Sequence, residues 1–229
     1  MPYVPAAERR RQLVDAASRV IRQVGLERAT TRLIAEAAGA SLPSVHYAFQ
    51  DKDALLAAVC EHWLQLAADL LHRLVPPDCG TEQAIGNLMR GFYEWVADDP
   101  ELGLAQYELL VWAVRHRADT DLAGRFHTAY RSACREALAR TLAAGHALDH
   151  ELDRELGRDL GRELDDVTAT MATALDGCLI RLLATGDGPA VRGDLERFIG
   201  LAVTAARGWS SAGSHCLTVG QVGSDDPAI

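Results

Sequence analysis

Lysine is almost absent from this chain of 229 residues: arginine supplies every basic side chain except Lys52. Proline is also scarce, with 8 residues in all, so long stretches contain no residue that interrupts a helix. Alanine, leucine and arginine, which are abundant here, are all good helix formers. These properties predict an all-α protein, and 48% hydrophobic residues are enough to build a buried core.

Cysteine is sparse and unpaired in sequence, because the five residues are widely spaced and form no C-x-x-C motif. This excludes a disulfide framework and a cysteine-based zinc site, and it favours a reducing compartment. The N-terminal stretch MPYVPAAERRRQLV lacks the apolar segment of a signal peptide. No uninterrupted apolar run reaches the roughly 18 residues of a membrane helix. We therefore expect a cytoplasmic protein with no membrane partner.

The motifs of common catalytic sites are missing too. The chain contains no G-x-S-x-G, no G-x-G-x-x-G and no phosphate-binding loop. His150 and Glu151 begin like the zinc motif H-E-x-x-H, but Arg154 stands where the second histidine belongs. We expect no enzymatic activity, no cofactor and no metal site. An enzyme built on helices remains as the last of three hypotheses, after the two that are developed below.

Charge is distributed unevenly along the chain. The net charge is −9, which by itself argues against a nucleic-acid partner. Residues 1–52, however, carry a net charge of +3, and the remainder carries −12. This asymmetry singles out the first fifty residues as a basic head on an acidic body, suited to a polyanionic partner.

Three short helices are predicted within this basic head. An apolar stripe of helical period runs through RRRQLVDAASRVIRQV and ends at Gly25. The segment TTRLIAEAAGA is a second helix, which either Thr30 or Thr31 can cap. Ser41 caps a third, with Pro43 in its first turn. Two short helices joined by a glycine-containing turn are typical of a helix-turn-helix.

The rest of the chain is expected to be helical, giving about nine helices in total. We expect a helix-turn-helix domain at 8–52, a larger helical ligand-binding and dimerisation domain at 53–212, and a flexible tail at 213–229. A fourth helix begins after Asp51, a good cap, and leads out of the head. The charged segment 147–166 has leucine at every fourth position, which suits either an exposed helix or a ragged connector.

The stretch TTRLIAEAAGASLPSVHYAFQDKDALL, residues 30–56, resembles the TetR family of bacterial transcriptional repressors. The similarity consists of a Thr-capped helix, IA..AG, a serine, a short recognition helix followed by Phe, and then Lys and Leu. It covers residues 9–60; further on, only helix order is similar, with LDGCLIRLL looking like the family's eighth helix. The resemblance implies a sequence-specific DNA-binding regulator that represses a nearby operon and is released by a small molecule.

The resemblance also implies which residues contact DNA. Lys52, at the start of the fourth helix, and the Tyr47 hydroxyl would each bind a phosphate, which explains why the one lysine stands where it does. The alternatives are that Lys52 is merely exposed and that Tyr47 packs under the turn. Arg9, Arg10 and Arg11 are either DNA contacts or a solvated charge run. The full predicted set is Thr31, Arg32, Ser41, Leu42, Pro43, Ser44, His46, Tyr47 and Lys52.

His46 and Ala48 depart from the family's commoner Tyr and His at these positions. They keep open a second hypothesis, a helical small-ligand-binding protein with a degenerate DNA-reading head. The first hypothesis implies a homodimer on palindromic double-stranded DNA, because one small head makes few base contacts.

The resemblance further implies a dimer interface and an effector pocket. The interface is expected in the eighth and ninth helices; the alternative is that the same residues fill the monomer's own core. They are Leu175, Leu179, Leu182, Leu183, Phe198, Leu201, Ala205 and Trp209. The pocket for a small apolar effector is expected among the middle helices, at seven aromatic residues and one methionine that form ordinary core if no ligand binds: Trp63, Phe92, Tyr93, Tyr107, Trp112, Phe126, Tyr130 and Met171.

Overall fold

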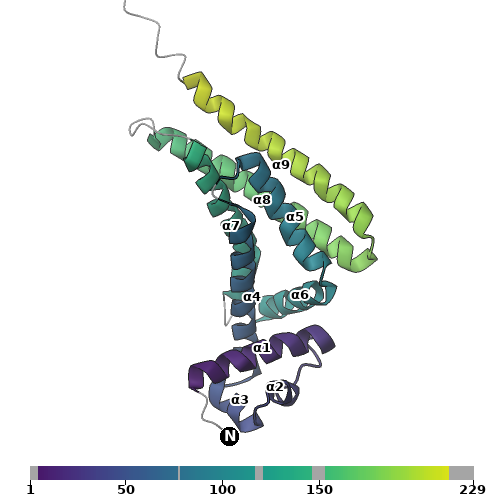
Figure 1. The fold of residues 1–229 in the computed structure, drawn as a ribbon. Coiled ribbons are helices and arrows are strands. Elements are labelled where there is room, and N and C mark those ends of the chain that lie inside the picture. The colour runs from purple at the N-terminus through teal and green to yellow at the C-terminus, as the bar shows by residue number, and fades with distance from the viewer. Residues whose placement is uncertain (1–4, 77, 117–120, 146–152, 217–229) are drawn as a thin grey trace, which may run out of the picture.

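The computed structural model describes residues 5–76, 78–116, 121–145 and 153–216, with side chains described except at 143–145, 153–160 and 208–216. Every regular element in these residues is a helix, which confirms the all-α prediction (Figure 1). The nine helices of this part are α1 (Ala6–Val24), α2 (Thr31–Ala37), α3 (Leu42–Ala48), α4 (Lys52–Leu74), α5 (Thr81–Ala97), α6 (Pro100–Arg115), α7 (Leu122–Gly145), α8 (Asp153–Thr185) and α9 (Gly188–Cys216).

Side-chain caps set the starts of the helices near the N-terminus. Thr30, and not Thr31, caps α2, because its hydroxyl accepts the Leu33 N–H at 3.2 Å. The Ser41 hydroxyl caps α3, and the Asp51 carboxylate accepts the Ala54 N–H at 2.7 Å at the start of α4. Gly25 ends α1 with a φ of 80°, a conformation that side chains disfavour.

The head, which we define as α1–α3 with their connecting turns, shares its core with two helices of the body. Leu13 and Ile21 of α1 are fully buried against the first half of α4 and against Leu109 of α6. Arg22 also forms an ion pair with Asp99, the cap of α6. In Figure 1, α4 rises from the head into the body and α6 lies beside α1. Both helices therefore fix the position of the head.

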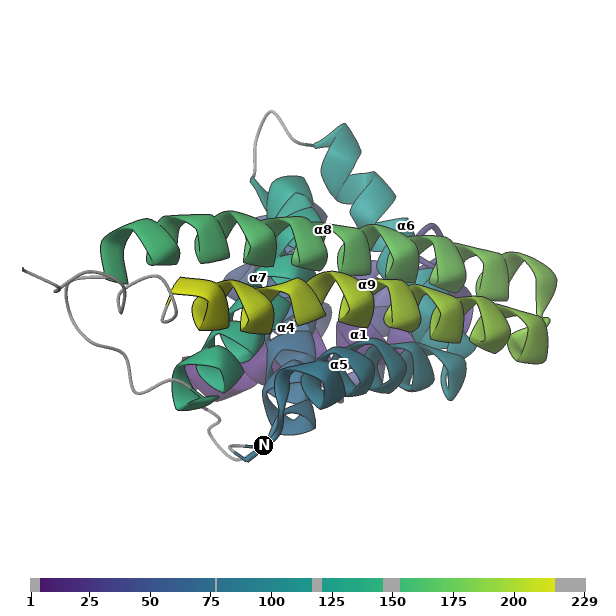
Figure 2. The same cartoon turned by 90° about the horizontal axis from the view of Figure 1, so that it is seen from above.

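The body consists of α5 to α9 and most of α4, and within it α5, α7, α8, α9 and the end of α4 pack around a second core. The helices α8 and α9 form a long antiparallel pair joined at Gly186, whose φ is 67° (Figures 1 and 2). In this pair α9 is the outer helix in Figure 1. The four cysteines with described side chains, Cys60, Cys79, Cys134 and Cys178, are free and buried.

The charged segment is helical wherever it is described. Residues 153–166 form the start of α8, and the helix continues through Gly157 and Gly161. Leu164 is buried while Asp165 is exposed and pairs with Arg135 at 2.7 Å. Residues 147–152 lie outside the described residues, as does the expected tail from 217 onward, while 213–216 continue α9.

Two helices are long and apolar enough to cross a membrane by length and composition alone. They are α4 and residues 161–185 of α8, with mean hydropathies of 1.3 and 1.4. Core helices of soluble proteins pass the same test, and each of these two contributes side chains to the cores described above. Neither helix contains a long uninterrupted apolar run, because charged residues occur along both.

Candidate nucleic-acid interface and effector cavity

The turn between α2 and α3 is compact and leaves one face of α3 free. Gly39 has a φ of 58°, and the Ala40 N–H donates to the Ala35 carbonyl at 2.9 Å, which reverses the chain. Val45 of α3 and Ile34 of α2 are buried against α1. Val45 is buried, whereas Leu42, Pro43, His46 and Tyr47 are exposed. The helix α3 lies at the end of the molecule that is farthest from α9 (Figure 1).

The residues predicted to contact DNA all lie outside the core. Tyr47 is 87% exposed, and Leu42 is 39% exposed. Four others are exposed (Arg32, Ser41, Pro43, His46), and three are half-buried (Thr31, Ser44, Lys52). A large aromatic side chain that extends into solvent contributes nothing to the core, so its burial is left to a partner.

The surroundings of Lys52 leave its charge uncompensated. Its ammonium lies 3.4 Å from the Leu26 carbonyl, and no ion pair joins it to a carboxylate of the described residues. Asp51 turns back to cap α4, and Asp53 faces His116 at 3.9 Å. The two flanking carboxylates are thus directed away from the ammonium, which keeps it available to an anion.

Of the three N-terminal arginines, two have partners within the head. Arg10 donates to the Ala48 carbonyl at 2.9 Å, and its guanidinium lies 4.1 Å from the centroid of the Phe49 ring. Arg11 pairs with Glu8 one helical turn away. Arg10 thereby holds α1 against the end of α3, a structural role that the sequence pattern did not indicate.

A cavity of about 110 Å³ lies within the body, between α4, α5, α6, α7 and α8. Its aromatic lining consists of five of the eight residues predicted for the effector pocket: Trp63, Phe92, Tyr107, Phe126 and Tyr130. The other three lie elsewhere. Tyr93 donates its hydroxyl to the Gly188 carbonyl at 3.3 Å, Trp112 stacks on His116, and Met171 is buried in the core of the body.

Polar residues also line the cavity, and Gln106 and Asp176 among them were not expected from the sequence. They are Gln106, His127 and Asp176. Asp176 follows the uncharged residues 167–175 of α8, and a lone carboxylate after such a stretch was the available signal. Partial burial raises the pKa of Asp176, and the nearby His127 lowers it by a smaller amount. Burial likewise raises the pKa of Tyr107.

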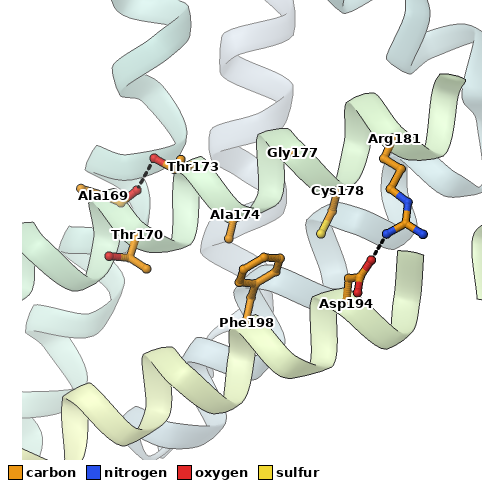
Figure 3. A pocket seen from close by; sticks show the side chains of 9 residues that line it. All are labelled: Ala169, Thr170, Thr173, Ala174, Gly177, Cys178, Arg181, Asp194 and Phe198. Carbon is orange, nitrogen blue, oxygen red and sulfur yellow. Dashed lines mark hydrogen bonds and ion pairs between the residues drawn. The ribbon is translucent and has the colours of Figure 1, made fainter. Parts of the chain in front are cut away.

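A groove of about 720 Å³ runs along the outer side of α8 and α9 (Figure 3). Small residues of α8 form its floor, among them Thr173, Ala174 and Gly177, and the Phe198 ring of α9 faces them. The ion pair between Arg181 and Asp194 lies at one end.

The predicted interface residues divide between this outer side and the interior. Phe198, Leu201 and Ala205 are exposed, with Leu201 at 63%. Leu175 and Leu179 instead point into the body and line the cavity. Leu182 and Leu183 are half-buried, and the side chain of Trp209 lies outside the described residues. Ile180, which is 50% exposed, was not predicted. Within the described chain, no cluster of three or more His, Cys, Asp or Glu side chains is arranged to hold a metal ion.

Comparisons with known proteins agree with this arrangement. Residues 13–59 match the sequence model of the family described as "Bacterial regulatory proteins, tetR family". Over 127 residues the chain is 35% identical to the HTH-type nicotine-responsive transcriptional repressor HdnoR of Paenarthrobacter nicotinovorans, an alignment that covers 56% of this chain and 66%, just under two thirds, of that repressor.

Solved structures extend the similarity of fold beyond the head. A putative TetR-family regulator from Rhodococcus sp. superimposes with a TM-score of 0.65 at 22% identity, covering 86% of this chain and 99% of that one. The multidrug binding protein EbrR, solved in complex with imidazole, gives a TM-score of 0.56 at 23% identity over 86% of this chain and 97% of its own. At these identities the structures establish a common fold.

Proposed function

The chain belongs to the TetR family of bacterial regulatory proteins, and from this premise we propose that it is a sequence-specific DNA-binding repressor of a nearby operon. The observation that carries the proposal is the free face of α3, where Tyr47 is 87% exposed. At the start of α4, the Lys52 ammonium adds a positive charge that has no carboxylate partner in the described residues. We assign the protein no enzymatic activity, since its relatives are transcriptional regulators. We place it in the cytoplasm, where its DNA would be.

On this proposal α3 enters the major groove. Leu42 and Pro43 lie at its exposed start, where apolar side chains can contact a thymine methyl group. Ser44 and His46 offer hydrogen-bonding groups to base edges. Thr31, Arg32, Ser41, Tyr47 and Lys52 would bind phosphates, which fixes the orientation of the head and does not select a sequence.

We further propose that two copies associate through the outer side of α8 and α9. Phe198, Leu201 and Ile180 expose apolar surface there, and the small residues of the groove let a partner helix approach closely. Pairing about a two-fold axis would create a four-helix bundle and present two heads to a palindromic operator.

A small molecule in the cavity is the proposed effector. HdnoR, which is similar to this chain in sequence, is nicotine-responsive, and EbrR, which is similar in fold, is a multidrug binding protein. Such a ligand would bind a form of the dimer in which the spacing of the two heads does not match the operator. It would shift the population of dimers away from the DNA-binding form, and the size of this shift is limited by the ligand's difference in affinity for the two forms.

Two hydrogen bonds connect the cavity to the head. Trp63, which lines the cavity, donates its indole N–H to the Ser18 hydroxyl of α1 at 2.6 Å. Glu108, next to the cavity residue Tyr107, accepts the Leu26 N–H at 2.6 Å. The Leu26 carbonyl in turn faces the Lys52 ammonium. A displacement of α4 or α6 by a ligand would therefore move the loop after α1.

Replacing Glu108 with alanine will weaken this connection. The Leu26 N–H loses a charged acceptor in a partly buried site, so the free energy of unfolding should fall by about 1–2 kcal/mol. The effector should also lower operator affinity by a smaller factor than in the unmodified protein. Chemical denaturation and operator titrations with and without effector measure the two effects. Glu101→Ala, an exposed carboxylate of the same helix, should change neither; an unchanged effector response in Glu108→Ala would contradict the coupling role.

DNA from upstream of the protein's own gene should be retarded in a gel-shift assay. We expect saturable binding that survives excess non-specific DNA and weakens steeply with salt, because phosphates supply much of the affinity. Footprints should show two half-sites related by a two-fold axis. Binding that competitor DNA abolishes would favour the second hypothesis, a ligand-binding protein with a degenerate head.

A further inference from the structure

The cavity contains one carboxylate, and a single imidazole, that of His127, lies near it. Asp176 is its only acidic residue, and neither lysine nor arginine occurs among its described lining residues. The Asp176 carboxylate accepts no hydrogen bond and forms no ion pair in the described part of the chain; the Tyr107 hydroxyl donates to the Asp176 backbone carbonyl instead, at 3.4 Å. Asp176 is exposed to solvent, and partial desolvation by its neighbours raises its pKa, so a cation from solvent can reach the carboxylate and would stabilise its charged form.

A second polar atom is left unsatisfied beside it. The Tyr130 hydroxyl is completely buried and has no hydrogen-bond partner among the described residues. The Cys134 thiol is near enough to influence its pKa, but no hydrogen bond of normal geometry joins the two groups. Buried hydroxyl groups almost always find a partner, so this one indicates a polar atom supplied from outside the chain.

The remaining wall is aromatic. The Phe92 and Tyr130 rings meet edge to face with centroids 5.0 Å apart, and Trp63 and Phe126 complete the lining. Such rings attract cations through their negative faces. The volume of about 110 Å³ is somewhat smaller than the roughly 150 Å³ of an engineered cavity that binds benzene, so the body of a ligand is limited to about one ring.

We propose that the effector is a small organic monocation, an amine that is protonated at neutral pH and carries a compact aromatic or apolar body. Its ammonium pairs with Asp176 at the mouth of the cavity, its body lies against Phe92 and Phe126, and its polar end satisfies the Tyr130 hydroxyl. This inference rests on the proposed function only in treating the cavity as the effector site. An anion would be repelled by Asp176, and a neutral ligand would form no ion pair with it.

Three ligands of nearly the same size test the charge. Benzylamine is a cation, benzyl alcohol is its neutral counterpart and benzoate is an anion. Calorimetric titration at about pH 8 compares their affinities. We expect benzylamine to bind at least ~10-fold more tightly than benzyl alcohol, which corresponds to one charge-assisted hydrogen bond, and benzoate to bind most weakly.

Two variants locate the effect. Asp176→Asn keeps the shape of the side chain and removes its charge, so the preference for benzylamine should disappear while benzyl alcohol binds as before. Asp166→Asn, an exposed position on the same helix outside the cavity, should leave the preference intact. Asp176→Asn should also fold at least as stably as the unmodified protein, because an unpaired carboxylate is lost.

The proposal is overturned if benzylamine fails to bind, if benzyl alcohol or benzoate binds as tightly, or if Asp176→Asn retains the preference. A gel shift with the same protein and no ligand tests the repressor proposal separately from the amine proposal. DNA binding without amine selectivity removes the amine proposal alone, and amine selectivity without DNA binding removes the repressor proposal alone.

Discussion

Replacing Gly177 with arginine will convert the proposed dimer into monomers and lower operator affinity by a factor on the order of 10³. Gly177 of α8 lines the groove (Figure 3), and a Cβ atom built there has no heavy atom within 4 Å. The monomer therefore accepts the larger side chain without strain. A partner helix packed into the groove does not, since a guanidinium would occupy its place and bring a charge into the interface.

Gly177→Ala is the matched control. It adds only a methyl group and replaces glycine in the middle of a helix, so it should stabilise the fold by up to about 1 kcal/mol and leave the dimer intact. Light scattering coupled to size-exclusion chromatography gives the mass of each variant, and gel shifts give its operator affinity. A dimer that persists in Gly177→Arg would show that the two copies meet on another surface.

Replacing Lys52 with glutamine will weaken binding to every DNA sequence by a similar factor. Each copy loses one phosphate contact, so a dimer loses two. Because the logarithm of the affinity changes with the logarithm of the salt concentration by about −0.9 per phosphate contact, the slope should become less steep by nearly 2. At low salt the loss should approach about 100-fold, whereas near physiological salt it should be smaller. Operator and non-specific DNA titrated over a range of salt concentrations provide the measurement.

Glutamine is chosen because Lys52 has a second, structural contact. The Lys52 ammonium lies 3.4 Å from the Leu26 carbonyl, and the side-chain amide of glutamine can still donate to that carbonyl. The head should therefore keep its position while the charge is lost. Lys52→Arg keeps the charge and should keep the slope. An unchanged slope in Lys52→Gln would assign Lys52 to holding the loop and not to DNA.

Local sequence signals predicted the head well. The caps at Ser41 and Asp51 and the stop at Gly25 act within four residues, so the sequence alone shows where α1, α3 and α4 begin or end. The same locality explains why Asp51, although next to Lys52, does not neutralise it: its carboxylate is committed to the Ala54 N–H. Which of Thr30 and Thr31 caps α2 was settled only by the structure.

The direction of side chains in α8 was not predictable in the same way. This helix packs against α5 and α7 on one side and α9 on another, so apolar residues surround much of its circumference and their period does not reveal which face is outermost. Leu175 and Leu179 were therefore expected at the dimer interface, although they line the cavity. Asp176 escaped notice for a related reason: a charged residue in a long helix is usually solvated, and only tertiary packing shows it beside Tyr107 and Tyr130.

The core of the head includes residues of α6, and this affects truncated, fused and mutated forms of the protein. Leu102 and Leu109, about fifty residues beyond the last turn of the head, complete the packing beneath α1. A fragment cut after α3, or one fused to an unrelated partner, would expose the apolar underside of α1 to water. During divergence, the stretch around α6 must therefore change in step with α1.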